Sequence, residues 1–199
     1  MKLIAITGGI GSGKSVVARM AQVMGYEVYD CDSRAKALMI EDKELRHALI
    51  EAFGNEIYMA DGNIDRQRLS AIAFSDKDAL ARLNALVHPA TARDMKRWAD
   101  HQAMAGASIA FVETALLRTA GLDKHVDAIW HVTAPAQVRI ERVMTRSGLT
   151  VEQVTDRIAA QQCVDSIKPD EQVIINDNVT AVLPEIIGLL NQLKTTNHK

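Results

Sequence analysis

Short apolar runs alternate with helical apolar repeats along this chain. The runs lie at residues 3–7, 27–31, 108–113, 126–132 and 172–176, and helical spacing fills the gaps between them. A run of about five apolar residues is typical of a buried strand, and strands that alternate with helices form right-handed crossovers in a parallel sheet. The pattern predicts a three-layer α/β fold in which helices cover both faces of a five-stranded parallel sheet.

The gap between the second and third runs is too long for a simple crossover. Roughly seventy residues separate these runs, whereas a crossover needs about a dozen. Two helical repeats flank the turn signal at residues 60–63, and the second repeat runs up to His88-Pro89. We therefore expect one domain over residues 1–199 with a helical insertion over about 36–105. The insertion either binds a substrate or only enlarges the core.

Residues 8–15 read GGIGSGKS and fit the phosphate-binding loop pattern G-x-x-x-x-G-K-[ST]. An apolar run precedes this loop and a helical repeat follows it, as the pattern requires. Glycines allow a tight turn whose N–H groups point at phosphate oxygens. Lys14 is expected to reach the β and γ phosphates, and the Ser15 hydroxyl to bind Mg²⁺. The residues predicted to bind the nucleotide are Gly9, Ile10, Gly11, Ser12, Gly13, Lys14, Ser15 and Val16.

Acidic residues follow the second and third runs. Ligands of a parallel sheet gather at the carboxyl ends of its strands, where Asp30-Cys31-Asp32 and Glu113 are expected to lie. For Asp30 two interpretations remain open: it caps the strand end, or it orders a magnesium-bound water.

A basic helical face follows the fourth run. Arg139, Arg142 and Arg146 are spaced i, i+3 and i+7, and Arg157 comes further along. One interpretation is a lid over about 138–165 whose arginines neutralise transferring phosphate. The other is a solvated face on which the arginines pair with Glu141, Glu152 and Asp156. The phosphate loop favours the lid.

Composition narrows the class of protein. Lys and Arg total 23 and Asp and Glu total 25, a formal net charge of -2, so we expect no nucleic-acid or membrane-surface partner. Cys31 and Cys163 are far apart and lack metal-ligand spacing, which fits a reducing cytoplasm. No apolar stretch approaches the roughly 18 residues of a membrane span, and the first run replaces a secretion signal. We expect a soluble cytoplasmic protein, a monomer or small homo-oligomer.

The sequence lacks the motifs of other classes of phosphate-loop protein. Neither the guanine-reading N-K-x-D nor the switch D-x-x-G of regulatory GTPases occurs in the chain, and Phe111-Val112-Glu113-Thr114 is a weak match to the Asp-Glu strand end of larger ATPases. The class of phosphate-loop protein that remains is a kinase that phosphorylates a small acceptor molecule.

Several motifs in order make the chain resemble the dephospho-coenzyme A kinase family over nearly its whole length. The family's T-G-G-I-G-S-G-K-S is present at residues 7–15, and its D-A-D is similar to Asp30-Cys31-Asp32, followed by Arg34 and Ala35. The central and C-terminal motifs are matched by Phe53-Gly54, Asp61-Gly62, Asp65-Arg66, Leu69, His88-Pro89, Arg142, Arg146, Arg157-Ile158, Gln161, Lys168 and Asn176.

The resemblance implies a P-loop kinase that transfers the γ phosphoryl group of ATP, with Mg²⁺, to the ribose 3′-hydroxyl of dephospho-coenzyme A. It assigns Asp32 as the base, Lys14 and Arg142 as partners of the phosphates, and the loop 176–178 as part of the adenine site. The acceptor contacts it implies are Asp32, Arg66, His88 and Arg139. Arg66 could instead pair with Asp61 or Asp65, and His88 could be a packed helix end.

Two segments depart from the family pattern. Residues 114–119 lack the proline, aromatic residue and glutamate that the family shows after its third strand, and Asp170-Glu171 replaces an A-D. Two rival hypotheses are a kinase of the same fold for a nucleoside monophosphate or sugar acid, and a nucleotide-binding regulator without catalysis.

Overall fold

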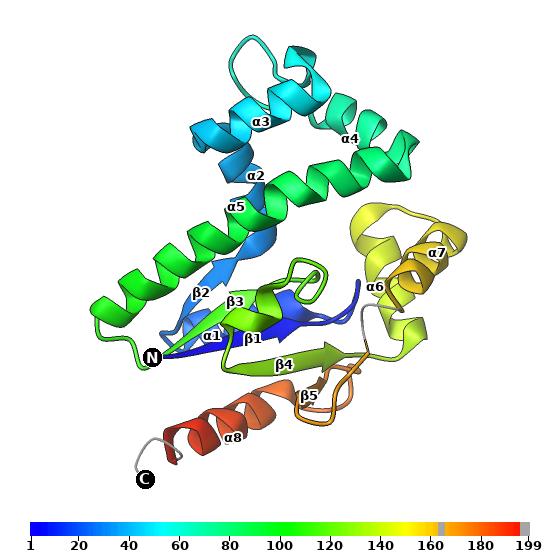
Figure 1. Cartoon of the computed structure of the whole chain (residues 1–199). Helices are drawn as coiled ribbons and strands as arrows, with labels where there is room; N and C mark the ends of the chain where they lie inside the picture. The colour runs from blue at the N-terminus through cyan, green and yellow to red at the C-terminus, as the bar shows by residue number, and fades with distance from the viewer. Residues whose placement is uncertain (163–165, 196–199) are drawn as a thin grey trace.

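The computed structural model describes residues 1–162 and 166–195 (Figure 1). Cys163 and the last residues of the lid range 138–165 lie outside the described residues. The elements in chain order are β1 (Lys2–Thr7), α1 (Lys14–Val23), β2 (Glu27–Asp30), α2 (Cys31–Glu41), α3 (Lys43–Phe53), η1 (Asn55–Ile57), α4 (Arg66–Ser75), α5 (Lys77–Met104), β3 (Ile109–Glu113), η2 (Leu122–His125), β4 (Ala128–Thr133), α6 (Ala136–Ser147), α7 (Val151–Gln162), β5 (Gln172–Ile175) and α8 (Val182–Thr195).

The five strands form one parallel sheet in the order β2-β3-β1-β4-β5. This confirms the predicted α/β class and the five predicted strands. The second strand ends one residue earlier than the apolar run predicts, because Cys31 already begins α2. β1 is central, so the loop that follows it opens between the ends of β3 and β4.

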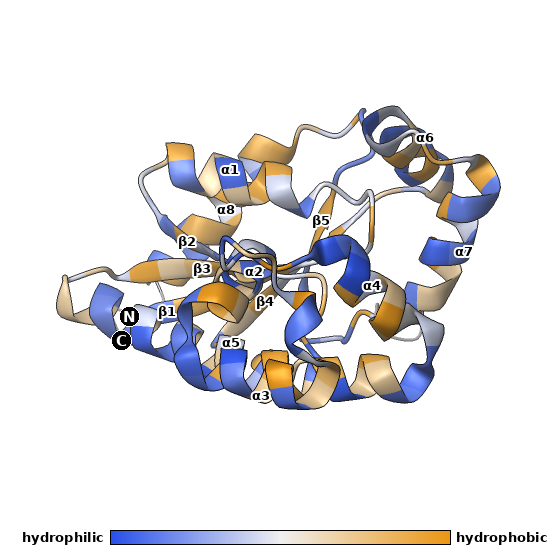
Figure 2. Ribbon diagram, turned by 90° about the horizontal axis from the view of Figure 1, so that it is seen from above, coloured by the Kyte–Doolittle hydropathy of each residue, from blue (hydrophilic) through white to orange (hydrophobic). Residues whose placement is uncertain are grey.

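Helices cover both faces of the sheet. Successive side chains of β1 point to opposite faces of the sheet. Ile4 and Ile6 pack with α1 and α8, whereas Leu3 and Ala5 pack with α5 and the segment after β3. Figure 2 shows the strands between α1 and α8 on one side and α5 on the other. The two buried clusters fix the ends of the strands, where the polar residues lie.

The insertion between β2 and β3 is a group of helices with its own core. Buried side chains of α2, α3, η1, α4 and α5 form a third cluster that includes Leu38, Leu49 and Val87. The prediction of a helix end near His88-Pro89 is wrong, because Pro89 lies inside α5, a single helix of 28 residues. Pro89 is exposed, and so is Ala85, the residue whose carbonyl group lacks the N–H of residue 89 as a donor, while Val87 and Ala90 pack inside. Among the described residues, no helix, α5 included, is both long and apolar enough to cross a membrane.

The two segments that depart from the family pattern meet in space. Arg118, from the altered segment after β3, forms an ion pair with buried Glu171, which also lies 3.2 Å from Nδ1 of His131 on β4. Arg118 also donates to the carbonyl of Ser166 at 3.0 Å. The altered residues thus compensate one another, since a buried carboxylate needs such partners.

Candidate active site

The phosphate loop joins β1 to α1 through glycines with a positive φ. Gly8, Gly11 and Gly13 have φ angles of 147°, 79° and 92°. A Cβ on Gly8 would overlap a carbonyl oxygen of β4, and one on Gly11 would lie 2.6 Å from a carbonyl oxygen of α6. Gly13 caps α1 without a side-chain hydrogen bond. The first N–H groups of α1 and its positive end are therefore available to an anion.

Lys14 and Ser15 occupy the first turn of α1, next to acidic groups. Ser15 is exposed and Lys14 is half-buried. Burial is the main reason that the pKa of the Glu113 carboxyl is raised above its ordinary value; Lys14 opposes the rise, and Asp30 and Asp32 add to it. These four side chains thus interact electrostatically, and a cation here would be stabilised by the acids.

The acidic groups gather because β2 and β3 end side by side. Asp30 pairs in register with Glu113, which in turn pairs with Ile6 of β1. The Asp30 carboxylate accepts hydrogen bonds from the backbone N–H groups of Asp32 at 3.0 Å and Ser33 at 3.1 Å. Of the two interpretations of Asp30, the contacts favour the cap. The exposed carboxylate of Asp32 makes no hydrogen bond or ion pair within the described part of the chain, so it can accept a proton.

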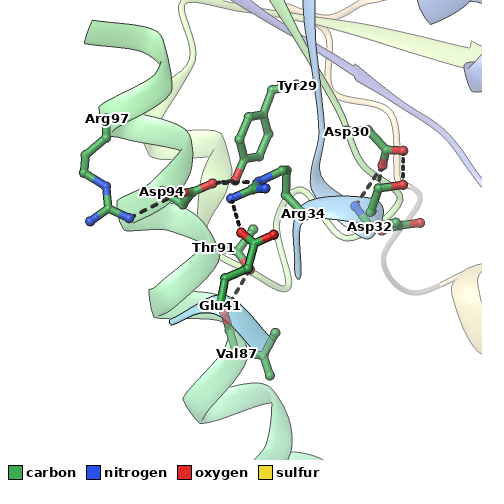
Figure 3. Close-up of polar contacts among 10 residues, drawn as sticks. Tyr29, Asp30, Asp32, Arg34, Glu41, Val87, Thr91, Asp94 and Arg97 are labelled. Carbon is green, nitrogen blue, oxygen red and sulfur yellow. Dashed lines mark hydrogen bonds and ion pairs between the residues drawn. The ribbon is translucent and has the colours of Figure 1, made fainter. Parts of the chain in front are cut away.

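A polar network holds the start of α2 against α5 (Figure 3). The carboxylate of Asp94 accepts hydrogen bonds from the hydroxyl of Tyr29 at 2.7 Å and from Nε of Arg34 at 3.1 Å. Arg97 contacts the same carboxylate at 3.2 Å, and Arg34 also pairs with Glu41 at 3.3 Å. The network fixes the helix that carries Asp32. Sequence reasoning missed it, because Asp94 lies 65 and 60 positions from its two main partners.

Arg142 joins the phosphate loop to the loop after β5. Its guanidinium group donates to the carbonyl oxygens of Gly11 and Ser12 at 3.3 Å each, and to the side-chain oxygens of Asn176, at 3.1 Å, and Asn178. Asn176 itself donates to the Ser12 carbonyl at 3.1 Å. The segment predicted to hold adenine therefore lies beside the segment predicted to hold phosphates.

The other arginines of the basic face differ in environment. Nε of Arg139 donates to the carbonyl of Ile10 at 2.8 Å, whereas Arg146 and Arg157 are exposed. Within residues 1–162 and 166–195, Arg142, Arg146 and Arg157 form no ion pair with a carboxylate. The interpretation of a solvated face on which arginines pair with acidic residues thus finds no support for these three arginines.

The insertion carries a pocket of about 530 Å³ near the start of α4. It is lined by Lys36, Ile40, Met59, Asn63, Ile64, Asp65, Arg66 and Gln67. Arg66 is exposed and pairs with neither Asp61 nor Asp65 in the described structure. Sequence reasoning missed Lys36, although it follows Asp32 by four residues and so shares a face of α2.

His88 stands apart from the lining of that pocket. It is half-buried in the middle of α5, and burial lowers the pKa of its imidazole. The structure therefore does not bring His88 to the same wall as Arg66, and the imidazole is expected to be neutral near pH 7.

The oxygen donors at this edge fit magnesium that arrives with a nucleotide. In the part of the chain that the structure describes, no group of three or more His, Cys, Asp or Glu residues could hold a metal ion alone. Mg²⁺ usually keeps several waters and takes one or two protein oxygens beside phosphate oxygens. The Ser15 hydroxyl, with the acids near it, suits that arrangement. Burial, the largest cause, raises the pKa of the intervening Cys31 thiol to about 12, so it offers no thiolate.

The chain is similar to known proteins over nearly its whole length. Residues 2–181 match the family model described as dephospho-CoA kinase. A dephospho-CoA kinase of Porphyromonas gingivalis is 33% identical over 197 residues, which cover 98% of this chain and 96% of the relative. A crystal structure from Thermus thermophilus is similar with a TM-score of 0.74 and 32% identity, covering 98% of this chain and 97% of that one. A dephospho-CoA kinase structure from Campylobacter jejuni, at 22% identity, shares the fold with a TM-score of 0.73 and coverage of 99% and 100%.

Proposed function

We propose roles for individual residues from one premise: the chain belongs to the dephospho-CoA kinase family. Enzymes of this family phosphorylate dephospho-CoA with ATP in the final step of coenzyme A biosynthesis. The protein is therefore a P-loop kinase, and the questions that remain concern which side chains act on the two substrates.

Asp32 is proposed as the base that accepts the proton of the ribose 3′-hydroxyl. An alcohol is a weak nucleophile at neutral pH, and a carboxylate that takes its proton as the new P–O bond forms assists the attack. The observation that supports this role is that the exposed carboxylate of Asp32, at the start of α2, makes no hydrogen bond or ion pair within the described residues. It is also close enough to Glu113 to raise the pKa of the Glu113 carboxyl. Asp30, in contrast, is committed to the cap of α2.

Lys14 and Arg142 are proposed to neutralise charge on the phosphates. Lys14 follows the last glycine of the loop, and Arg142 touches the loop at Gly11 and Ser12. Phosphoryl transfer spreads negative charge over the γ oxygens, so cations fixed in place beforehand lower the barrier. Arg142 also holds the loop after β5, which links adenine binding to the position of the phosphates. Within Gly9–Val16, the N–H groups that follow Ile10 would supply backbone contacts to the nucleotide, because the N–H of Ile10 itself donates to Gln161.

Ser15 is proposed as the protein ligand of a nucleotide-bound Mg²⁺. Such an ion screens the charge of the β and γ phosphates when bound. The hydroxyl of Ser15 would orient it from the first turn of α1, and Glu113 would accept a hydrogen bond from one of its waters. Mg²⁺ at this position would also offset the mutual repulsion of the acids.

The acceptor is proposed to lie over the insertion. Lys36 and Arg66 are two cations in the pocket beside α2, and they suit the diphosphate of dephospho-CoA, while Ile40 and Met59 offer apolar surface to its chain. Arg139 and His88 remain proposed acceptor contacts, Arg139 next to the phosphate loop and His88 as a neutral imidazole on α5. The insertion range 36–105 and the lid range 138–165 likewise remain proposals, as do a cytoplasmic location and a monomer or small homo-oligomer.

The role of Asp32 is tested by Asp32→Asn, with Asp30→Asn as a matched control from the same motif. Asn caps helices about as well as Asp, so Asp30→Asn keeps the cap and should retain turnover within a few-fold. Asp32→Asn should lower kcat by about a hundredfold or more, the range of a lost general base, and leave ATP affinity nearly unchanged. Equal effects of the two substitutions on kcat would remove Asp32 from this role.

A further inference from the structure

Helices α6 and α7 hold the tip of the phosphate loop. Their hydrophobic cluster consists of Val143, Val154 and Ile158, with Ile140, Met144 and Leu149 packed around them. Ile10, from the loop, packs into the same cluster. Of the cluster's residues in the described structure, Ile10 alone comes from outside the hairpin at 136–162, so an apolar side chain of the loop completes a core that the hairpin cannot complete itself.

Both polar groups of Ile10's own backbone also bind this hairpin. Its N–H donates to Oε1 of Gln161 at 2.7 Å, and its carbonyl accepts from Nε of Arg139 at 2.8 Å. The next residue, Gly11, lies so close to α6 that an added Cβ would be 2.6 Å from the Arg139 carbonyl oxygen. The tip of the loop is thus held by side-chain packing, two hydrogen bonds and backbone contact.

We infer that Gln161 is a positioning residue: through its hydrogen bond to the Ile10 N–H it keeps the phosphate loop in the shape that binds ATP. The N–H groups that follow Ile10 are expected to bind phosphate, and their directions depend on the turn at Ile10. A loop that samples other shapes binds ATP more weakly, in proportion to the fraction in the competent shape. Gln161 therefore acts on ATP without being assigned a contact with it. This inference rests on the proposed nucleotide site.

The test is Gln161→Met, which keeps the length of the side chain and removes the acceptor. Loss of one hydrogen bond should raise the Kd and KM of ATP about tenfold, with the KM of dephospho-CoA unchanged within about twofold. The backbone amide of Ile10 should exchange with deuterium faster in this variant. Gln153→Met is the matched control, because Oε1 of Gln153 accepts from the Thr150 N–H at 3.0 Å on the same helix, away from the loop.

The control separates positioning from general support of the hairpin. Gln153→Met should leave the Kd of ATP and the Ile10 amide as in the wild type, and the two variants should show similar Tm. An ATP Kd unchanged in Gln161→Met, or raised equally in Gln153→Met, would overturn the inference. So would a rise in both substrates' KM together with a fall in Tm. ATP binding is measured without the acceptor, so it tests the role of Gln161 independently of the reaction. A wild-type protein that binds ATP but fails to phosphorylate dephospho-CoA would count against the proposed function, and the comparison of ATP Kd values would still test the role of Gln161.

Discussion

Asp94→Ala should destabilise the protein and slow catalysis, because Asp94 ties α5 to both β2 and α2. Its side chain is 16% exposed, and its bond to the Tyr29 hydroxyl is charge-assisted and short, at 2.7 Å. Such a bond contributes about 1.5–3 kcal/mol. The pair with Arg34, which is 38% exposed, adds up to about 1 kcal/mol after screening, and Arg97, at 70% exposed, adds almost nothing. The expected loss is about 2–4 kcal/mol.

In a chain of this length that loss lowers Tm by roughly 5–15 °C. Thermal unfolding followed by circular dichroism measures it, with Arg97→Ala as the control because it removes only the exposed partner. Arg97→Ala should change Tm by less than about 2 °C. Since Arg34 lies in the first turn of α2, the helix that carries Asp32, kcat should fall more than the affinity for ATP changes. A Tm loss in Asp94→Ala no larger than in Arg97→Ala would refute the anchoring role.

The same network predicts how stability depends on pH. Burial, the largest effect, raises the pKa of Asp94, but hydrogen bonds from Tyr29, Arg34 and Arg97 bring it below the ordinary 3.8. A carboxylate with a lowered pKa stabilises the fold fully above its unfolded pKa, and this contribution disappears as pH falls through the folded pKa. The difference in Tm between the wild type and Asp94→Ala should therefore shrink only below about pH 4. A difference that shrank between pH 7 and 5 would contradict this.

Two further predictions concern the pocket and the acids. Arg66→Ala should raise the KM of dephospho-CoA about tenfold or more in steady-state assays and leave the KM of ATP unchanged, because a charge-assisted hydrogen bond to the acceptor is lost. Arg68→Ala is the control, because Arg68 is exposed and lies outside the pocket lining. Glu113→Gln should raise Tm at pH 7 by a few degrees and lower turnover. Burial raises the pKa of the Glu113 carboxyl above its ordinary 4.5. The contribution of this carboxyl to stability is therefore complete below pH 4.5 and lost as pH rises through the folded pKa. The rise in Tm caused by Glu113→Gln should accordingly vanish near about pH 4.

The sheet and the phosphate loop could be predicted from the sequence because their signals are local. Five apolar runs correspond to the five strands, and the spacing of glycines, Lys14 and Ser15 specifies the loop. The uncommitted carboxylate of Asp32 lies where the strand-end rule expects an acid. These features depend on neighbouring residues, which a single sequence displays directly.

Features that depend on distant partners could not be predicted in this way. Nothing near Asp94 indicates Tyr29, and Ile10 reads as an ordinary loop residue until α6 and α7 are placed beside it. The proline in α5 indicated a helix end, but buried neighbours on one face and solvent on the other carry the helix through. Tertiary packing decided each of these cases.

Transfer to the 3′-hydroxyl itself is tested most directly by acceptor-dependent release of ADP. Wild-type protein with ATP and Mg²⁺ should release ADP and form coenzyme A when dephospho-CoA is added, and phosphorus NMR should show a new 3′-phosphate. The 3′-deoxy analogue of dephospho-CoA, which binds but lacks the reacting oxygen, should give no acceptor-dependent ADP. Release of ADP that does not depend on the 3′-hydroxyl, or turnover with a nucleoside monophosphate or sugar acid in place of dephospho-CoA, would contradict the account.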